Sequence, residues 1–341
     1  MAERHINIPI FIPHLGCPNA CVFCNQRTIS GVSRFEPSSV RDTIEAVLST
    51  AGDSECEIAF FGGSFTGIDR ELMISLLEIA SEYIRNGRVT SVRCSTRPDY
   101  IDEEIISILE KYKVRTVELG LQSASDRVLS VCKRGHGFDA ERRAVGMLLD
   151  RGFSVVGQMM IGLPGATLDD EIETARFIID SGITAARIYP TVVFRDTELC
   201  EMTVAGEYTP LSLEDAIFRA GEVLKLLVGA DVKIIRIGLC ASENLSSSDT
   251  YFAGPNHPAL GELIENELYY GQIKEKISRL NVKAKKIKVT VALGALSKAI
   301  GQRKKNRIRL LSDFPDTRID FAESSELSGY RVEVEGEERN V

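Results

Sequence analysis

The chain has 341 residues, of which 44% are hydrophobic and 26% charged, and its formal net charge is −8. These fractions are typical of a globular protein, and a chain of this length can bury a core without disulfide bonds. No stretch approaches the roughly 18 apolar residues of a membrane-spanning helix, which argues against a membrane protein. The first residues do not form a signal segment, and eight cysteines without one favour a reducing compartment. We therefore expect a cytoplasmic protein.

Hydrophobic periodicity predicts an alternation of strands and helices along the chain. Short apolar runs predict strands at residues 6–12, 57–61, 91–95, 116–121, 154–160 and 185–193. Between them, apolar residues recur at the spacing of amphipathic helices, and the pairs Thr167–Asp170 and Ser212–Asp215 have the spacing of helix-capping boxes. Strands that are each followed by a helix are typical of parallel βα units. Such units form either a barrel or a doubly wound sheet, and the periodicity does not distinguish the two.

Three cysteines directly after the first predicted strand carry the strongest chemical signal. Cys17, Cys21 and Cys24 have the spacing C-x3-C-x2-C, so that one short loop can direct three thiolates to one point. Three thiolates without an obvious fourth fit a [4Fe–4S] cluster in which one iron stays open to another ligand. The alternative is a structural zinc ion held by the same thiolates and His14. We interpret the remaining, scattered cysteines as buried structural thiols, namely Cys56, Cys94, Cys132, Cys200 and Cys240.

Glycine and polar residues stand at the ends of the later predicted strands. Gly62 and Gly63 follow the second strand, Arg97 the third, Gln122 the fourth and Gly162 the fifth. Two adjacent glycines allow a ligand to approach the backbone closely, although a tight turn would need them equally. Polar groups at the ends of apolar strands are costly to bury without partners. Their recurrence in one layer of the sheet predicts a ligand at that layer.

The cysteine spacing, with Phe23 directly before the last cysteine, resembles the signature of the radical S-adenosylmethionine (SAM) superfamily. The resemblance implies an α/β fold, a partial (β/α)6 TIM-type barrel with a smaller C-terminal α/β extension. In such barrels the chemistry lies at the C-terminal ends of the strands. The resemblance also implies a [4Fe–4S] cluster and SAM as cofactors, with reductive cleavage of SAM to a 5′-deoxyadenosyl radical. An electron donor of the ferredoxin or flavodoxin type would then be a partner.

Five ordered motifs are similar to the radical SAM half of the Elongator catalytic subunit, and more loosely to oxygen-independent coproporphyrinogen oxidases. They lie at residues 95–99, 118–123, 133–136, 162–165 and 188–191, within a match from about residue 6 to about residue 260. The resemblance implies that Cys17, Cys21 and Cys24 ligate the cluster. It assigns contacts with SAM to Phe23, Gly62, Gly63, Thr96, Gln122, Arg134, Gln158, Met160 and Gly162.

Each of these contacts has an implied role. Arg134 would pair with the SAM carboxylate, for which a bidentate guanidinium is suited. Gly62 and Gly63 would hold the SAM amine. The other assigned residues divide between the adenine (Phe23, Met160, Gly162) and the methionine or ribose (Thr96, Gln122, Gln158).

The chain departs from Elongator in two respects. Only three residues separate its first two cysteines, and the roughly 100 residues after about residue 240 contain no obvious acyl-CoA loop. In addition, Ser64 stands where many members of the superfamily carry a glutamate, and Gln158 replaces an acid of the related oxidases. The chain therefore resembles a short bacterial relative without the acetyltransferase domain, and the Elongator reaction is not carried over. We expect a partial barrel over residues 1–235 and an extension over residues 236–341.

The expected extension contains a strongly basic stretch. From Gly271 to Leu311 there are nine Lys and four Arg against one Glu, a net charge of +12, which leaves −20 for the rest of the chain. Such asymmetry indicates nucleic-acid binding when the cations form one patch. No aromatic residue interrupts the run, so contact with an RNA backbone is expected rather than base stacking. The alternative is a solvated helical face. The stretch from 323 to 338 is acidic. We interpret His257 as a turn cap, and the alternative is a residue that reaches the active site.

Three hypotheses for the function follow from the sequence and the resemblance. The first is a radical SAM enzyme that modifies RNA, with a substrate of the tRNA type implied by the resemblance to Elongator. The second is a radical SAM enzyme that acts on a small or porphyrin-like molecule. The third is a zinc-binding scaffold without enzymatic activity, which the Cys17, Cys21, Cys24 and His14 set would serve.

Overall fold

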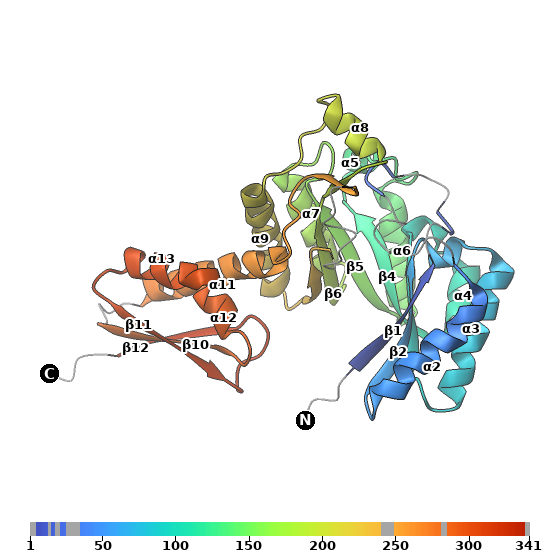
Figure 1. The fold of residues 1–341 in the computed structure, drawn as a ribbon, viewed down its shortest axis with the longest axis horizontal. Coiled ribbons are helices and arrows are strands. Elements are labelled where there is room, and N and C mark those ends of the chain that lie inside the picture. Colours follow the sequence, from blue (N-terminus) through green and yellow to red (C-terminus); the bar gives the residue numbers. More distant parts are fainter. Residues whose placement is uncertain are drawn as a thin grey trace.

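Seven parallel strands form the main sheet of the computed structural model, which describes residues 5–12, 15–17, 21–24, 35–239, 249–280 and 285–337. Their order is β1 (His5–Ile12), β2 (Glu55–Gly62), β3 (Ser91–Thr96), β4 (Val114–Gln122), β5 (Ser154–Ile161), β6 (Ala185–Pro190) and β8 (Lys233–Ile237). The sheet curls into an open half-barrel with helices on its convex side (Figure 1). The expected α/β fold and partial barrel are therefore confirmed.

The helices that follow the strands bury one face of the sheet. They are α2 (Val40–Ala51), α3 (Arg70–Arg85), α4 (Glu103–Lys111), α6 (Phe138–Asp150), α7 (Leu168–Asp180) and α9 (Leu213–Gly229). In β1, Ile8, Ile10 and Ile12 are buried in the core shared with these helices, whereas Phe11 is 40% exposed. Because side chains alternate along a strand, Phe11 belongs to the opposite, concave face.

Shorter elements surround the C-terminal ends of the strands. The helices are α5 (Asp126–Val131) and α8 (Glu198–Val204), the 3-10 turns are η1 (Pro37–Ser39), η2 (Phe65–Gly67) and η3 (Pro98–Tyr100), and β7 (Val193–Phe194) pairs with β9 (Tyr251–Ala253). No helix among the described residues is long and apolar enough to cross a membrane.

The predicted elements agree with the structure except near the end of the barrel. The predicted strand at 185–193 is wrong beyond Pro190, where β6 ends, and its last residue, Val193, belongs to the separate strand β7. The sequence analysis also missed β8. The predicted capping box is confirmed at Thr167 and Asp170, and Ser212 accepts from the amide of Asp215 at 3.0 Å.

A second, smaller layer of sheet and helices forms the C-terminal extension. Its central strand β10 (Lys286–Ala292) pairs with the parallel β11 (Arg318–Ser324) and the antiparallel β12 (Val332–Glu337). The other elements are α11 (Leu260–Arg279), α12 (Leu296–Ile300), η4 (Gln302–Lys304) and α13 (Lys305–Asp313). Helix α11 extends from the half-barrel into this layer (Figure 1).

The two halves of α11 belong to different hydrophobic cores. Leu260, Ile264 and Leu268 pack into the core of the half-barrel, whereas Ile273 and Ile277 pack into that of the extension. A division of the chain near residue 235 stays a proposal, which these two cores support.

Candidate active site

The three predicted cluster ligands lie in the loop that follows β1. Cys17 is exposed, Cys21 is buried and Cys24 is half-buried. The amide of Cys24 donates to the carbonyl oxygen of Cys21 at 2.9 Å, which closes a turn between them. The amide of Val22 donates to the carbonyl oxygen of Cys132 at 3.3 Å, so that the loop is fixed to the segment after α5. His14, the fourth ligand of the zinc alternative, lies outside the described residues.

The scattered cysteines lie apart from this loop in the sequence. Cys56, Cys94 and Cys132 are buried, as expected of structural thiols, whereas Cys200 is half-buried. Cys240 lies outside the described residues. Burial raises the pKa of the Cys132 thiol to about 12, which keeps this thiol protonated and unreactive at neutral pH.

The backbones of the cysteine loop and of the loop after β2 interlock through glycines. Gly16 has a φ of +75°, and a Cβ atom there would lie 2.1 Å from the carbonyl oxygen of Ser64. A Cβ atom on Gly63 would lie 2.2 Å from the carbonyl oxygen of Leu15, and one on Gly62 would lie 2.6 Å from that of Ile12. Packing alone therefore requires Gly62 and Gly63, and their contact with the SAM amine stays a prediction.

Two buried arginines, Arg97 and Arg134, place positive charge near the thiols of the loop. Arg134 donates through Nη1 to the sulfur of Cys21 at 3.3 Å and through Nη2 to the carbonyl oxygen of Gly120 at 2.6 Å. Burial raises the pKa of the Cys17 thiol, and the charges of Arg97 and Arg134 oppose that rise. Two positive charges thus lie beside the loop, and positive charge stabilises thiolates and other anions.

The cysteine loop supplies three thiols as possible metal ligands. Among the described residues, which include Cys17, Cys21 and Cys24, no three His, Cys, Asp or Glu side chains gather as ligands of one metal ion. In a four-iron cluster each thiolate binds a separate iron, so a loop that supplies three thiolates fits that group.

Thr96, Gln122 and Arg134 converge around Gly120 at the C-terminal end of β4. A Cβ atom on Gly120 would lie 3.0 Å from Nε2 of Gln122 and 3.6 Å from Nη2 of Arg134. Gln122 has a φ of +69°, and its buried Oε1 atom has no hydrogen-bond partner among the described residues. Buried polar atoms are nearly always paired, so this amide fits a bound ligand. The hydroxyl of Thr96, in contrast, already contacts that of Ser64 at 2.7 Å.

The residues assigned to adenine lie close to one another. Phe23 and Met160 pack against the same apolar cluster, which contains Val22, Val128, Cys132, Leu163, Val193, Leu199 and Tyr208. Gly162 follows β5 with a φ of +76° and accepts a hydrogen bond from the hydroxyl of Tyr208 at 2.7 Å. Gln158 precedes Met160 by two residues in β5 and pairs in register with Arg187 of β6.

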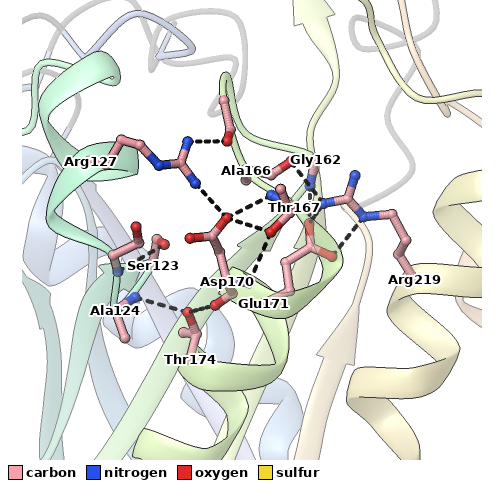
Figure 2. A network of polar contacts seen from close by, with 12 residues as sticks. Ser123, Ala124, Arg127, Gly162, Ala166, Thr167, Asp170, Glu171, Thr174 and Arg219 are labelled. Carbon is pink, nitrogen blue, oxygen red and sulfur yellow. Dashed lines mark hydrogen bonds and ion pairs between the residues drawn. The ribbon is translucent and has the colours of Figure 1, made fainter.

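The loop after β5 is held by an ion pair that the sequence analysis missed (Figure 2). Glu171 accepts from the amide of Gly162 at 2.6 Å and from Nη2 of Arg219 at 2.6 Å. Burial raises the pKa of Glu171, and Arg219 opposes that rise. On the other side of the loop, Asp170 accepts from Arg127 and from the amide of Thr167, both at 2.8 Å. These contacts fix the segment that carries Gly162.

A second buried network leads from Arg97 to helix α6. Arg97 donates to both carboxylate oxygens of Asp99, at 2.9 and 2.8 Å. Nδ1 of His136 lies 3.2 Å from Oδ1 of Asp99, and its Nε2 lies 3.4 Å from Oε1 of Glu141. Glu141 is fully buried, and burial raises its pKa to about 8. The motifs at 95–99 and 133–136 contain three of these residues, but no sequence pattern indicated their pairing.

Charged residues also line the concave face of the half-barrel. Arg93 donates to Glu57 at 2.5 Å and to Glu118 at 2.9 Å, and Arg187 donates to Glu118 at 2.8 Å. Burying a charge is costly unless it is paired, and here each charge has a partner on a neighbouring or facing strand. The interior of the half-barrel at these positions is therefore polar rather than an apolar core.

Beyond the barrel, His257 forms the turn cap that the sequence analysis expects. Its Nδ1 atom accepts from the amide of Ala259 at 3.1 Å, directly before helix α11. The contact is local, so it gives His257 a structural role at the start of this helix.

Comparisons with known proteins agree with this geometry. The profile of the Radical SAM superfamily matches residues 11–178, and that of the Radical_SAM C-terminal domain matches residues 183–270. Protein YhcC of Escherichia coli (strain K12) is 23% identical over 221 residues, which are 61% of this chain and 71% of that protein. A tRNA uridine(34) acetyltransferase of Methanocaldococcus infernus is 35% identical over 133 residues, which are 38% of this chain and 25% of that enzyme.

The fold also has a solved counterpart. The structure of the archaeal Methanocaldococcus infernus Elp3 with an N-terminal deletion superposes with a TM-score of 0.63 at 24% identity. The superposition covers 82% of this chain and 65% of that one, and at this identity it shows the shared fold alone. Together, the two profile matches span most of the chain, from residue 11 to residue 270. This protein is an enzyme of the radical SAM superfamily.

Proposed function

We propose that this enzyme binds a [4Fe–4S] cluster through Cys17, Cys21 and Cys24 and uses it to cleave SAM reductively. The observation that carries the proposal is the contact of Arg134 with Cys21 in a loop of three thiols at the end of β1. When bound, the cluster and SAM would supply a 5′-deoxyadenosyl radical that takes a hydrogen atom from a C–H bond. A ferredoxin or flavodoxin would donate the electron.

The chain's own residues would bind and orient SAM. Arg134 is buried beside the thiols and suits the carboxylate, because a guanidinium forms two parallel hydrogen bonds with it. The unpaired Oε1 of Gln122 would accept from the amine or a ribose hydroxyl. The shared packing of Phe23 and Met160 supports an adenine site between them, beside the rigid loop at Gly162.

Thr96 and Gln158 stay predicted contacts with the methionine or ribose. The carbonyl groups of Gly62 and Gly63 stay predicted contacts with the SAM amine.

The cluster is tested by anaerobic reconstitution with iron and sulfide. We expect about four irons and four sulfides per wild-type chain, and an electron paramagnetic resonance signal after reduction that changes when SAM is added. Cys21→Ala should lose the signal. Cys56→Ala is the matched control, because Cys56 is a free, buried thiol near the opposite end of β2. One zinc and no cluster in the wild type would contradict the proposal.

We further propose that the substrate is an RNA of the tRNA type. The likeness to a tRNA uridine(34) acetyltransferase supports this class, as does the basic stretch 271–311. Several cations of that stretch are paired with acids, namely Lys274 with Asp313, Arg279 with Glu275, Lys298 with Glu265 and Arg309 with Glu267. Others lie on the sheet in β10, and Lys283 is outside the described residues.

An exposed cationic group remains at the start of α13. Arg303, Lys304 and Arg307 are exposed and have no ion-pair partner among the described residues. They are the part of the basic stretch best suited to bind phosphates. The cytoplasm is the proposed location, since it contains such RNA and keeps cysteines reduced.

RNA binding is tested with total bacterial tRNA at several salt concentrations. Lys304→Glu/Arg307→Glu should weaken binding and lower the log–log slope of affinity against salt by about 0.9 for each phosphate that the variant no longer neutralises. The control Arg115→Glu/Arg143→Glu makes the same change of charge at exposed positions of the half-barrel. Equal weakening in both variants, or no binding by the wild type, would contradict the RNA proposal and favour a small substrate.

A further inference from the structure

One edge of the Arg97 guanidinium has no assigned role. Its Nε and Nη2 atoms bind Asp99, and Nη2 also donates to the carbonyl oxygen of Arg134 at 2.5 Å. Its Nη1 atom is buried and has no hydrogen-bond partner among the described residues. A buried donor without a partner destabilises the folded state. Native structures rarely keep such a donor without a reason, and a ligand is one such reason.

Arg97 belongs to the surroundings of the thiols. Through the carbonyl oxygen of Arg134 it contacts the residue whose side chain donates to Cys21 at 3.3 Å. Its own amide donates to Oγ of Ser64 at 3.2 Å, and the amide of Ser64 donates to the carbonyl oxygen of Leu15 in the cysteine loop at 3.2 Å. Arg97 itself is only 4% exposed, so little solvent screens its charge from the site.

The orientation of the Arg97 side chain is fixed through the Nε and Nη2 atoms of its guanidinium. Asp99 holds two of its nitrogens, and Nδ1 of His136 lies 3.2 Å from Nη2. Nε2 of His136 in turn lies 3.4 Å from Oε1 of Glu141 in α6. A guanidinium that is anchored along one edge and free along the other is a preorganised donor, which loses little entropy when it binds an anion.

We infer that Arg97 is a second anion-binding guanidinium of the cluster site, in addition to Arg134, and that Asp99, His136 and Glu141 position it. Its free Nη1 would donate to an anionic acceptor of the loaded site, either the thiolate–sulfide shell of the cluster or the SAM carboxylate. The inference rests on the proposed function, because both acceptors belong to it.

The two acceptors predict different measurements. If Nη1 donates to the cluster, Arg97 stabilises the reduced form, which carries one more negative charge. Arg97→Gln would then lower the ratio of reduced to oxidised cluster at least tenfold at a fixed potential, which is about 59 mV for a one-electron couple. If Nη1 donates to SAM, the potential without SAM would stay constant and the Kd for SAM would rise at least tenfold.

The experiment is a redox titration of the reconstituted holoenzyme, followed by electron paramagnetic resonance, with and without SAM. Arg97→Gln is compared with Arg97→Lys, which keeps the charge and should shift less. The control is Arg93→Gln, which removes a half-buried guanidinium from β3, the strand directly before Arg97, one that is paired with Glu57 and Glu118. Thermal unfolding of each variant separates a folding defect from a change at the site.

A double variant tests whether Arg97 acts directly. Arg97→Gln also leaves Asp99 without its guanidinium partner, whereas Arg97→Gln/Asp99→Asn does not leave that charge uncompensated. A shift in potential or SAM affinity that persists in the double variant supports the inference. A shift that disappears in the double variant, or an equal potential and SAM affinity in wild type and Arg97→Gln, would overturn the inference about Arg97 and leave the proposed function intact. A wild-type chain that assembles no cluster would overturn it together with the proposed function.

Discussion

The substitution Gly16→Ala should disrupt the site more than the fold, because Gly16 lies where the cysteine loop meets the loop after β2. A Cβ atom would lie 2.1 Å from the carbonyl oxygen of Ser64 and 2.7 Å from backbone atoms of Gly67 and Ile68. Ordinary van der Waals contact would require a backbone shift of about 1 Å. The φ of +75° adds about 1–2 kcal/mol for a non-glycine residue, and overpacking adds about 1–3 kcal/mol. The free energy of unfolding should therefore fall by about 2–5 kcal/mol.

Gly87→Ala is the matched control for that prediction. Gly87 also has a positive φ, +71°, but a Cβ atom there would meet nothing within 4 Å. Gly87→Ala should lower the free energy of unfolding by only about 1–2 kcal/mol, which is the cost of the left-handed backbone conformation. Unfolding in urea measures both costs, and iron content after anaerobic reconstitution measures the placement of Cys17. Equal stability and equal iron content of the two variants would refute the interlocking of the loops as the reason for Gly16.

Three further substitutions test the buried networks. Arg219→Met leaves the carboxylate of Glu171 buried without its partner and should lower the free energy of unfolding by about 3–5 kcal/mol in urea; a decrease below about 1 kcal/mol would contradict the burial of this pair. Because burial raises the pKa of Glu141 to about 8, the folded chain keeps a proton that the unfolded chain releases above about pH 4.3. Its contribution to stability is thus lost as the pH rises from about 5 to 8, and Glu141→Gln should flatten this decline in urea titrations at several pH values, whereas an unchanged slope would argue against it. Thr167→Ala removes the capping box and should cost about 1 kcal/mol, measured as a change in the urea midpoint at constant slope.

The local pattern of the sequence predicted most of the half-barrel because its strands are buried on the helix side. In β1, the alternation of Ile8, Ile10 and Ile12 with less apolar residues is a strand signal by itself. Strand β8 was missed because its five residues, Lys233–Ile237, include two exposed cations and no buried residue. The closure of the sheet into a half-barrel depended on the family resemblance, since the periodicity permits an open sheet equally.

The networks of the site could not be predicted, because they join residues far apart in the sequence. Arg97 meets His136 only where the loop after β3 and the segment after α5 come together, 39 positions apart. Likewise, Glu171 and Arg219 come from helices α7 and α9. The basic stretch shows the same limit, because its net charge does not indicate that acids such as Asp313 and Glu265 pair with its cations.

Formation of 5′-deoxyadenosine from SAM tests the central claim most directly. The holoenzyme is reconstituted anaerobically, reduced with dithionite and assayed for this product by liquid chromatography, with Cys24→Ala and Cys56→Ala beside it. We expect 5′-deoxyadenosine and methionine from the wild type and from Cys56→Ala, and none from Cys24→Ala. A reduced cluster that leaves SAM intact, or equal product from all three proteins, would contradict the proposed reaction.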